Sequence, residues 1–163
     1  MARWRVVLGV AAMLLTWAAI VEAGQDHGTW ARYTNARFGY SICYPADLFV
    51  PRGESDNGDG QTFLAKEGAE FSVWGSHNAM GMTLDNVVAM RLSDNTPPFV
   101  PTYRAGKPDW RVVSGTFGEK IFYYKVMAHN DEFHSLWMAY DLSARPVYDP
   151  VVKRLSACFH SLH

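Results

Sequence analysis

The sequence has almost no excess of either charge and no basic cluster. Its 163 residues include 15 Lys or Arg and 16 Asp or Glu. A nucleic-acid-binding domain usually has a basic face, and a protein held at an anionic membrane surface usually has a polybasic patch. Because the cations here are few and scattered, we exclude nucleic acid and the membrane surface as partners.

Sequence motifs of catalysis are also missing. No serine lies in the Gly-x-Ser-x-Gly turn of a hydrolase nucleophile, and no phosphate-binding glycine motif precedes an expected helix. No pair of carboxylates lies where the chain requires it to be buried. We therefore expect no cofactor and lean against an enzyme, although an active site assembled from distant residues would leave no such motif.

The N-terminus has the features of a secretory signal peptide. Met1–Arg5 contains two arginines, residues 6–21 are almost wholly apolar, and a small residue, Ala23, stands where a signal peptidase would cut. The apolar run of 16 residues is shorter than the roughly 20 needed to cross a bilayer, which favours cleavage over a transmembrane anchor.

These features define the expected mature protein. The sequence predicts a signal peptide over residues 1–23 and one periplasmic or secreted domain over residues 24–163, with no stable membrane insertion after cleavage. Cleavage leaves 13 of the 15 basic and 15 of the 16 acidic side chains, a formal charge of −2. The remaining length is sufficient for a domain with a hydrophobic core.

Export affects the interpretation of the two cysteines. Cys43 and Cys158 lie 115 positions apart, one in the first expected hairpin and one in the last expected helix. In an oxidising compartment such a pair favours a disulfide bond that ties the two ends of the domain together. Two buried free thiols are the alternative, because cysteine also behaves as a small apolar residue.

Apolar periodicity and turn residues predict a sheet-rich domain. An aromatic hairpin is expected over Trp30–Pro45, turning at residues 35–37. One helix is expected to begin at the N-cap Thr83, and a final helix at Asp149, with Pro150 in its first turn. The other expected strands are Gln61–Lys66, Glu70–Gly75, Trp110–Thr116, Lys120–Ala128 and Phe133–Leu142.

The expected loops and the distribution of apolar residues along the strands indicate the layers of the fold. Two stretches rich in proline, glycine and charge, residues 46–60 and 95–108, are expected to form loops. In the later strands apolar residues fall on both faces, as with the neighbours Ile121 and Phe122. A strand that is apolar on both sides is usually covered on both sides. We therefore predict an α+β fold, an antiparallel β-sheet covered by helices on both faces.

The first half of the domain carries a family resemblance. The pattern comprises Tyr33, Asn35, Arg37-Phe38-Gly39-Tyr40-Ser41-Ile42, Tyr44-Pro45, Asn57-Gly58-Asp59-Gly60, Phe63, Gly68-Ala69, Phe71 and Val73. In these residues the chain resembles a family of small, uncharacterised exported proteins of Gram-negative bacteria. Its order of elements is also similar to the α/β/α sandwich of the PsbP-type extrinsic photosystem subunits and the Mog-type Ran-binding proteins.

The resemblance implies a PsbP/Mog-like fold and no particular activity, because a shared fold does not transmit a partner. The exported family does not require cysteine at positions 43 or 158. Their joint presence here therefore strengthens the prediction of a disulfide bond between Cys43 and Cys158.

The acidic loop is one candidate binding site. Asp56, Asn57 and Asp59 offer the oxygen ligands that Ca²⁺ prefers. Their spacing fails the template of the helix-loop-helix calcium site, which needs acids or amides at alternate positions and a glutamate twelve along, because glycine holds position 58. A solvated turn is the better interpretation.

A pair of histidines is the candidate metal site. His129 and His134 flank the turn of an expected hairpin, so they could approach each other with Asp131 or Glu132 nearby. A zinc site needs three or four converging ligands and an ordered second shell. Ordinary exposed histidines are therefore the simpler interpretation.

The leading functional hypothesis is a non-catalytic binding module of the cell envelope, which takes a protein or a small ligand. The chain has more tryptophan and tyrosine than a small core needs, and such residues at a surface often anchor an interface. One alternative is a metal-dependent or other hydrolase that uses His129, His134 and nearby acids. The other is a structural component of the envelope.

Overall fold

The computed structural model describes residues 28–93 and 95–162, so the predicted signal peptide lies outside the described residues. The strands are β1 (Trp30–Asn35), β2 (Tyr40–Pro45), β3 (Phe49–Glu54), β4 (Gly60–Ala65), β5 (Glu70–His77), β6 (Val100–Lys107), β7 (Trp110–Phe117), β8 (Lys120–His129), β9 (Glu132–Asp141) and β10 (His160–Ser161). The helices are α1 (Leu84–Arg91), the 3-10 turn η1 (Leu142–Ala144) and α2 (Arg145–Cys158). No helix in this part of the chain is both long and apolar enough to cross a membrane.

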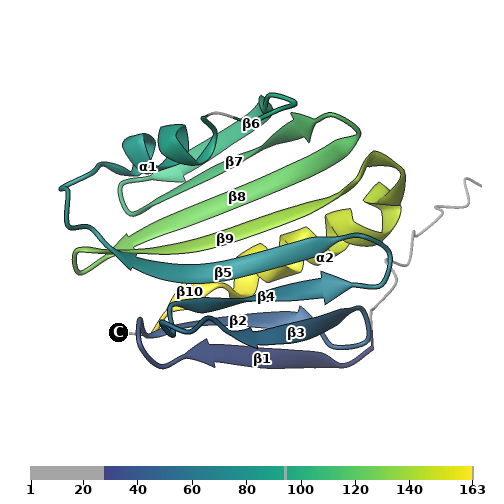
Figure 1. Cartoon of the computed structure of the whole chain (residues 1–163), viewed down its shortest axis with the longest axis horizontal. Helices are drawn as coiled ribbons and strands as arrows, with labels where there is room; N and C mark the ends of the chain where they lie inside the picture. Colours follow the sequence, from purple (N-terminus) through teal and green to yellow (C-terminus); the bar gives the residue numbers. More distant parts are fainter. Residues whose placement is uncertain (1–27, 94, 163) are drawn as a thin grey trace, which may run out of the picture.

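The strands form two antiparallel sheets (Figure 1). The larger has seven strands in the order β3-β4-β5-β9-β8-β7-β6, and the smaller has three in the order β1-β2-β10. The predicted opening hairpin is confirmed as β1–β2, and its turn is held by the Asn35 side chain, which accepts a hydrogen bond from the Phe38 amide at 2.8 Å. The strands predicted between 61 and 75 and between 110 and 142 are also confirmed.

Two strands were predicted as loops. β3 and β6 lie at the two edges of the larger sheet, so each pairs on one side only. Most of their residues are exposed, and each strand contains a proline and a glycine. Edge strands do not need alternating apolar residues, which is why the pattern of residues 46–60 and 95–108 looked like loop sequence.

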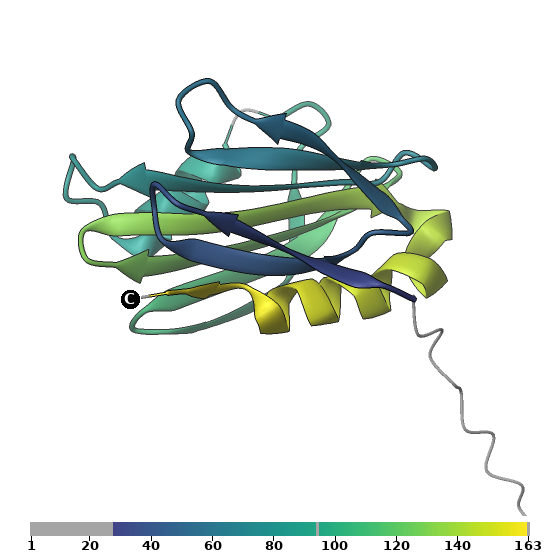
Figure 2. The same cartoon turned by 90° about the horizontal axis from the view of Figure 1, so that it is seen from below.

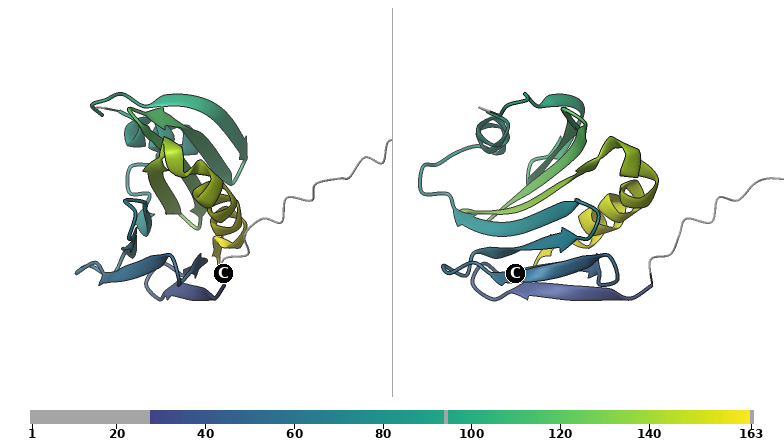
Figure 3. Two further views of the ribbon diagram at one scale, coloured as in Figure 1. Left: turned by 90° about the vertical axis from the view of Figure 1, so that its right-hand side faces the viewer. Right: turned by 45° about the vertical axis from the view of Figure 1, so that its right-hand side comes forward.

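The prediction that helices cover both faces of the sheet is wrong. One face of the larger sheet packs against α2 together with the smaller β1-β2-β10 sheet, as Figure 2 shows from below. On the opposite face α1 covers only part of the sheet, mainly β7 and β8, because it is eight residues long (Figure 3). The layer that packs on the first face is therefore mainly a second sheet. Apolar periodicity shows that a strand is covered on both faces, but it does not show whether a helix or a sheet covers it.

The two faces have separate hydrophobic cores. The first fills the space between the larger sheet, α2 and β2, and includes the fully buried Tyr40, Ile42 and Leu155. The second lies under α1 and includes Phe122 and Trp137, whose rings stack at 5.5 Å. Apolar residues on both faces of β8 and β9 thus do face two cores, as their pattern predicted.

The helix α2 begins earlier than predicted. It starts at Arg145, so Pro150 lies inside it and Asp149 does not cap it. The Asp149 carboxylate instead accepts a hydrogen bond from the Tyr140 hydroxyl at 2.7 Å and pairs with Arg145 at 3.3 Å. Pro146 stands in the first turn, where its missing N–H leaves no partner unsatisfied.

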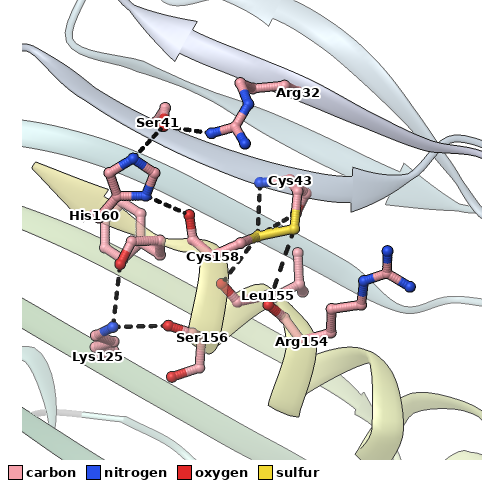
Figure 4. The surroundings of a disulfide bond; sticks show 10 residues. Arg32, Ser41, Cys43, Lys125, Arg154, Leu155, Ser156, Cys158 and His160 are labelled. Carbon is pink, nitrogen blue, oxygen red and sulfur yellow. Dashed lines mark hydrogen bonds between the residues drawn. A yellow bond between two sulfur atoms is a disulfide. The ribbon is translucent and has the colours of Figure 1, made fainter. Parts of the chain in front are cut away.

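A disulfide bond between Cys43 and Cys158 joins β2 to the end of α2, as predicted, with Cα atoms 5.8 Å apart (Figure 4). Beside it, the Lys125 ammonium from β8 donates hydrogen bonds to the carbonyls of Ser156 at 2.8 Å and Phe159 at 3.2 Å. The C-terminal end of α2 is therefore fixed to both sheets, to the smaller by a covalent bond and to the larger by a half-buried cation.

Candidate functional site

The structure brings the two predicted histidines together at the β8–β9 turn. The ring centroids of His129 and His134 are 6.1 Å apart. Glu132 lies beside them, with one carboxylate oxygen 3.2 Å from His77 and the other 3.7 Å from the His134 Nε2 atom. Within residues 28–93 and 95–162, however, no three His, Cys, Asp or Glu side chains form a group that could hold a metal ion.

The His134 side chain is fully buried. Its Nδ1 atom lies 2.9 Å from the Ser161 hydroxyl of β10, and its Nε2 atom has no hydrogen-bond partner in the described chain. Burial lowers the pKa of His134, and the Glu132 carboxylate partly opposes that shift. A neutral imidazole at this position holds the C-terminal strand against β9 and offers no surface to a substrate.

Three polar side chains of the acidic loop bond to one another, and Asp56 is not among them. The Asp59 carboxylate accepts hydrogen bonds from the Ser55 hydroxyl and, at 3.0 Å, from the Asn57 amide. The loop is also fixed to the first hairpin, because the Asn35 side chain donates to the Gly58 carbonyl at 2.9 Å and the Tyr40 hydroxyl to the Asp59 carbonyl at 2.9 Å. Asn57 and Asp59 are thus brought together as parts of a turn, in keeping with the simpler interpretation of this segment.

Two adjoining clefts beside α1 form a charged groove. One cleft, of about 620 Å³, lies between the start of α1, the β6–β7 turn and the β8–β9 turn. The other, of about 380 Å³, lies between α1 and the strands β6 and β7. Both clefts are lined by Asp85 and Arg111, so they meet at this pair. We call their combined surface the α1 groove.

The pair at the centre of the α1 groove is well defined. The Arg111 guanidinium donates to the two carboxylate oxygens of Asp85 at 2.7 and 3.2 Å, and also to the Trp110 carbonyl at 3.0 Å. Hydrogen bonding from Arg111 lowers the pKa of the Asp85 carboxyl group. A side-chain carbon at Gly106 would lie 2.7 Å from the Arg111 Cδ atom, so glycine is needed for Arg111 to lie across β6.

The two ends of the α1 groove differ in charge. At the end near β6, Arg104 and Lys107 join Arg111, with Asp85 as the acidic side chain of that cleft. At the end near the β8–β9 turn, the lining includes Asp109, Asp131 and Glu132, together with His129. The groove can therefore hold a ligand by charge complementarity along its length.

Sequence reasoning missed most of this groove. Arg104 and Lys107 lie in a segment predicted as a loop, and Asp85 lies in the first turn of the helix expected to begin at Thr83, where it carries no sign of a binding role. The groove depends on which strand lies next to α1, and that order follows from tertiary packing. The alternation of Tyr103 and Ala105 with charged or small residues was the one local signal of a strand there.

The chain was compared with known proteins. No family model matches it, and no curated protein matches it. Among solved structures it is similar to the cyanobacterial PsbP protein (CyanoP) from Synechocystis sp. PCC 6803, with a TM-score of 0.63 and 12% sequence identity over 90% of this chain and 98% of that one. The chain has a PsbP-like fold.

The PsbP-like fold was expected from the order of elements, and this part of the prediction is confirmed. At 12% identity the similarity concerns the arrangement of the backbone, because one fold carries many unrelated functions. The function must therefore be argued from the surface of this chain.

Proposed function

We propose that this chain is an exported, non-catalytic domain of the bacterial cell envelope that binds a protein or a small ligand in the α1 groove. The observation that carries the proposal is the pair of adjoining clefts that meet at Asp85 and Arg111. Concave surfaces with a few converging polar groups are the usual binding sites of proteins.

Export is supported by three observations. The N-terminus has the pattern of a signal peptide, and the first half of the domain resembles exported proteins of Gram-negative bacteria. The disulfide bond between Cys43 and Cys158 is of a kind that persists in oxidising compartments. The membership of that exported family is part of this proposal.

The absence of catalysis is supported by the chemistry of the groove. Its described lining contains neither serine nor cysteine, and Arg111 at its centre is held by the Asp85 carboxylate. The competing hypothesis, a metal-dependent or other hydrolase using His129 and His134, has weaker support because His134 has no exposed surface. A purely structural role in the envelope would leave the groove without a ligand.

A crosslinking pull-down tests the binding function. Residues 24–163, with the disulfide intact, serve as bait in an envelope extract of the native host. We expect one reproducible partner that is retained by Lys153→Ala, a change on the exposed side of α2, and depleted by Arg111→Ala in the groove. Equal capture by Arg111→Ala would place the binding site elsewhere.

Two further measurements test the alternatives. Turnover of ester, glycoside or peptide substrates that a single substitution abolishes would contradict a non-catalytic domain. A stoichiometric metal in protein purified without an affinity tag, lost in His129→Ala, would favour the metal-dependent alternative.

A further inference from the structure

The strand β6 is an open edge of the larger sheet. It pairs with β7 and with no other strand of the described chain. Six of its eight residues are exposed, and its position at the margin of the sheet is visible in Figure 1. The segment Tyr103–Lys107 pairs with β7 without interruption, so it is a regular template on which another strand could pair.

The opposite edge of the sheet is protected. The strand β3 has an irregularity between Pro51 and Glu54, and Gly53 within it has a φ of 93°. Proline and an irregular register hinder pairing with a further strand. In β6 the proline and the register shift are confined to Pro101–Tyr103, which leaves the second half regular.

The exposed side chains of β6 offer both apolar and basic contacts. Val100 and Tyr103 are 53% and 57% exposed, and their partners Thr116 and Ser114 place them on the face that carries α2. Arg104 is opposite Val113, which packs under α1, so it lies on the face of the α1 groove. An added strand would therefore meet an aromatic side chain on one face and a cation on the other.

The charge of β6 indicates which kind of strand would pair with it. The strand contains Arg104 and Lys107 and no acidic residue. Arg104 lies near enough to Asp85 for its charge to help lower the pKa of that carboxyl group, but the direct hydrogen bonds to Asp85 come from Arg111. A second copy of this chain pairing through the same edge would bring Arg104 and Lys107 close to their counterparts, and like charges on paired strands are destabilising.

We infer that β6 takes an acidic, extended segment of a partner protein as an added strand, with carboxylates meeting Arg104 on the face of the α1 groove and an apolar residue meeting Tyr103 on the other face. This inference rests on the proposed binding function and names its surface and the chemistry of its partner. The main-chain hydrogen bonds would give affinity, and the charges and the aromatic ring would select the sequence.

The test uses a blocked eight-residue peptide of alternating Glu and Val, with a peptide of alternating Lys and Val as its control. Binding to residues 24–163 is followed by NMR titration and by amide hydrogen exchange. We expect the acidic peptide to slow exchange in Tyr103–Lys107 and to leave β3 unchanged. Arg104→Glu should weaken binding by about tenfold, because the glutamates of the alternating peptide all lie on the face of Arg104. Lys107→Glu, on the face of Tyr103, should weaken it less, and Lys153→Glu on α2 should not weaken it.

Four outcomes would overturn the inference. One is equal binding of the basic peptide, and the second is protection of amides elsewhere but not in β6. The third is a concentration-dependent dimer that protects β6 without any peptide, which would make a second copy its occupant. The fourth is no binding at millimolar peptide. If the envelope pull-down still captured a partner in that case, the proposed binding function would stand, and only its surface and the chemistry of the partner would be wrongly assigned.

Discussion

The buried imidazole of His134 should make stability depend on pH. In the unfolded chain the histidine pKa is about 6.5, and burial lowers it in the folded state. The unfolded state then binds more protons as the pH falls below about 6.5, so the free energy of unfolding should decrease from pH 7.5 to pH 5. Urea unfolding across this range measures the effect.

Two variants test whether His134 causes this pH dependence of stability. His134→Gln keeps a polar side chain beside Ser161 and removes the titration, so its stability should change less between the two pH values. His129→Gln, at the neighbouring turn, should keep most of the wild-type slope, because burial is the larger cause of the His134 shift. The same slope in all three proteins would show that another group causes the dependence.

Close packing at Gly75 leads to a second prediction. A side-chain carbon there would lie 2.1 Å from the Cγ atom of Phe38, a buried residue of the first core. Gly75→Ala should therefore lower the free energy of unfolding by about 1–3 kcal/mol, the usual cost of overpacking. Gly28→Ala, where the nearest atom is 4.0 Å away, is the control and should be neutral. Chemical denaturation that finds the two variants equally stable would contradict this packing.

At the scale of the elements, the attachment of α2 to β8 depends on Lys125. Burial lowers the pKa of this lysine, and its ammonium donates to the carbonyl of Ser156 in the last turn of the helix and to that of Phe159 just after it. Lys125→Met would leave the Ser156 and Phe159 carbonyls without this donor and should cost about 1–3 kcal/mol. Denaturant unfolding gives the cost, and hydrogen exchange should show faster opening near the end of α2.

The matched control is Lys120→Met on the same strand. Lys120 lies 3.7 Å from Asp141 and is 43% exposed, so its ion pair is screened by water. This substitution should change stability by less than about 1 kcal/mol. If the two methionine variants behave alike, the carbonyl contacts of Lys125 do not stabilise the helix end.

The strength of local sequence patterns explains which elements could be predicted. β7, β8 and β9 are apolar on both faces, so their positions were evident from sequence. β3 and β6 have few buried residues and depend on the neighbouring strand for their conformation. The start of α2 was misplaced because Asp149 and Pro150 resemble a helix start, whereas Tyr140 binds Asp149 in the folded protein.

The candidate sites also differ in how local their contacts are in the sequence, and this decides which of them could be predicted. The proximity of His129 and His134 follows from a hairpin turn, which is local in sequence, so it could be predicted. The α1 groove joins α1 to a strand that follows it through a polar segment, and its central contact between Asp85 and Arg111 spans 26 positions. Burial of His134 beneath β10 also depends on the far end of the chain. Such contacts have no signature in a short window of sequence.

For the whole molecule, the disulfide bond is expected to be a main source of stability. A bond that closes a loop of 115 positions restricts the unfolded chain strongly, and removal of such bonds commonly costs about 2–5 kcal/mol. Reduction, or Cys43→Ser combined with Cys158→Ser, should lower the urea midpoint accordingly. Mass spectrometry without reductant should show a mass lower by two hydrogens. Two freely alkylated thiols in the native exported protein would contradict the bond.

The position of this bond also determines how the domain would respond to mechanical load. A force pulling on the two ends of the described chain enters through β1 and β2 on one side and through β10 on the other. At Cys43 and Cys158 it passes directly across the sulfur atoms, so the whole segment between them carries no tension. Stretching can peel away β1 and β10, but the seven-stranded sheet and its α1 groove would keep their shape under strain.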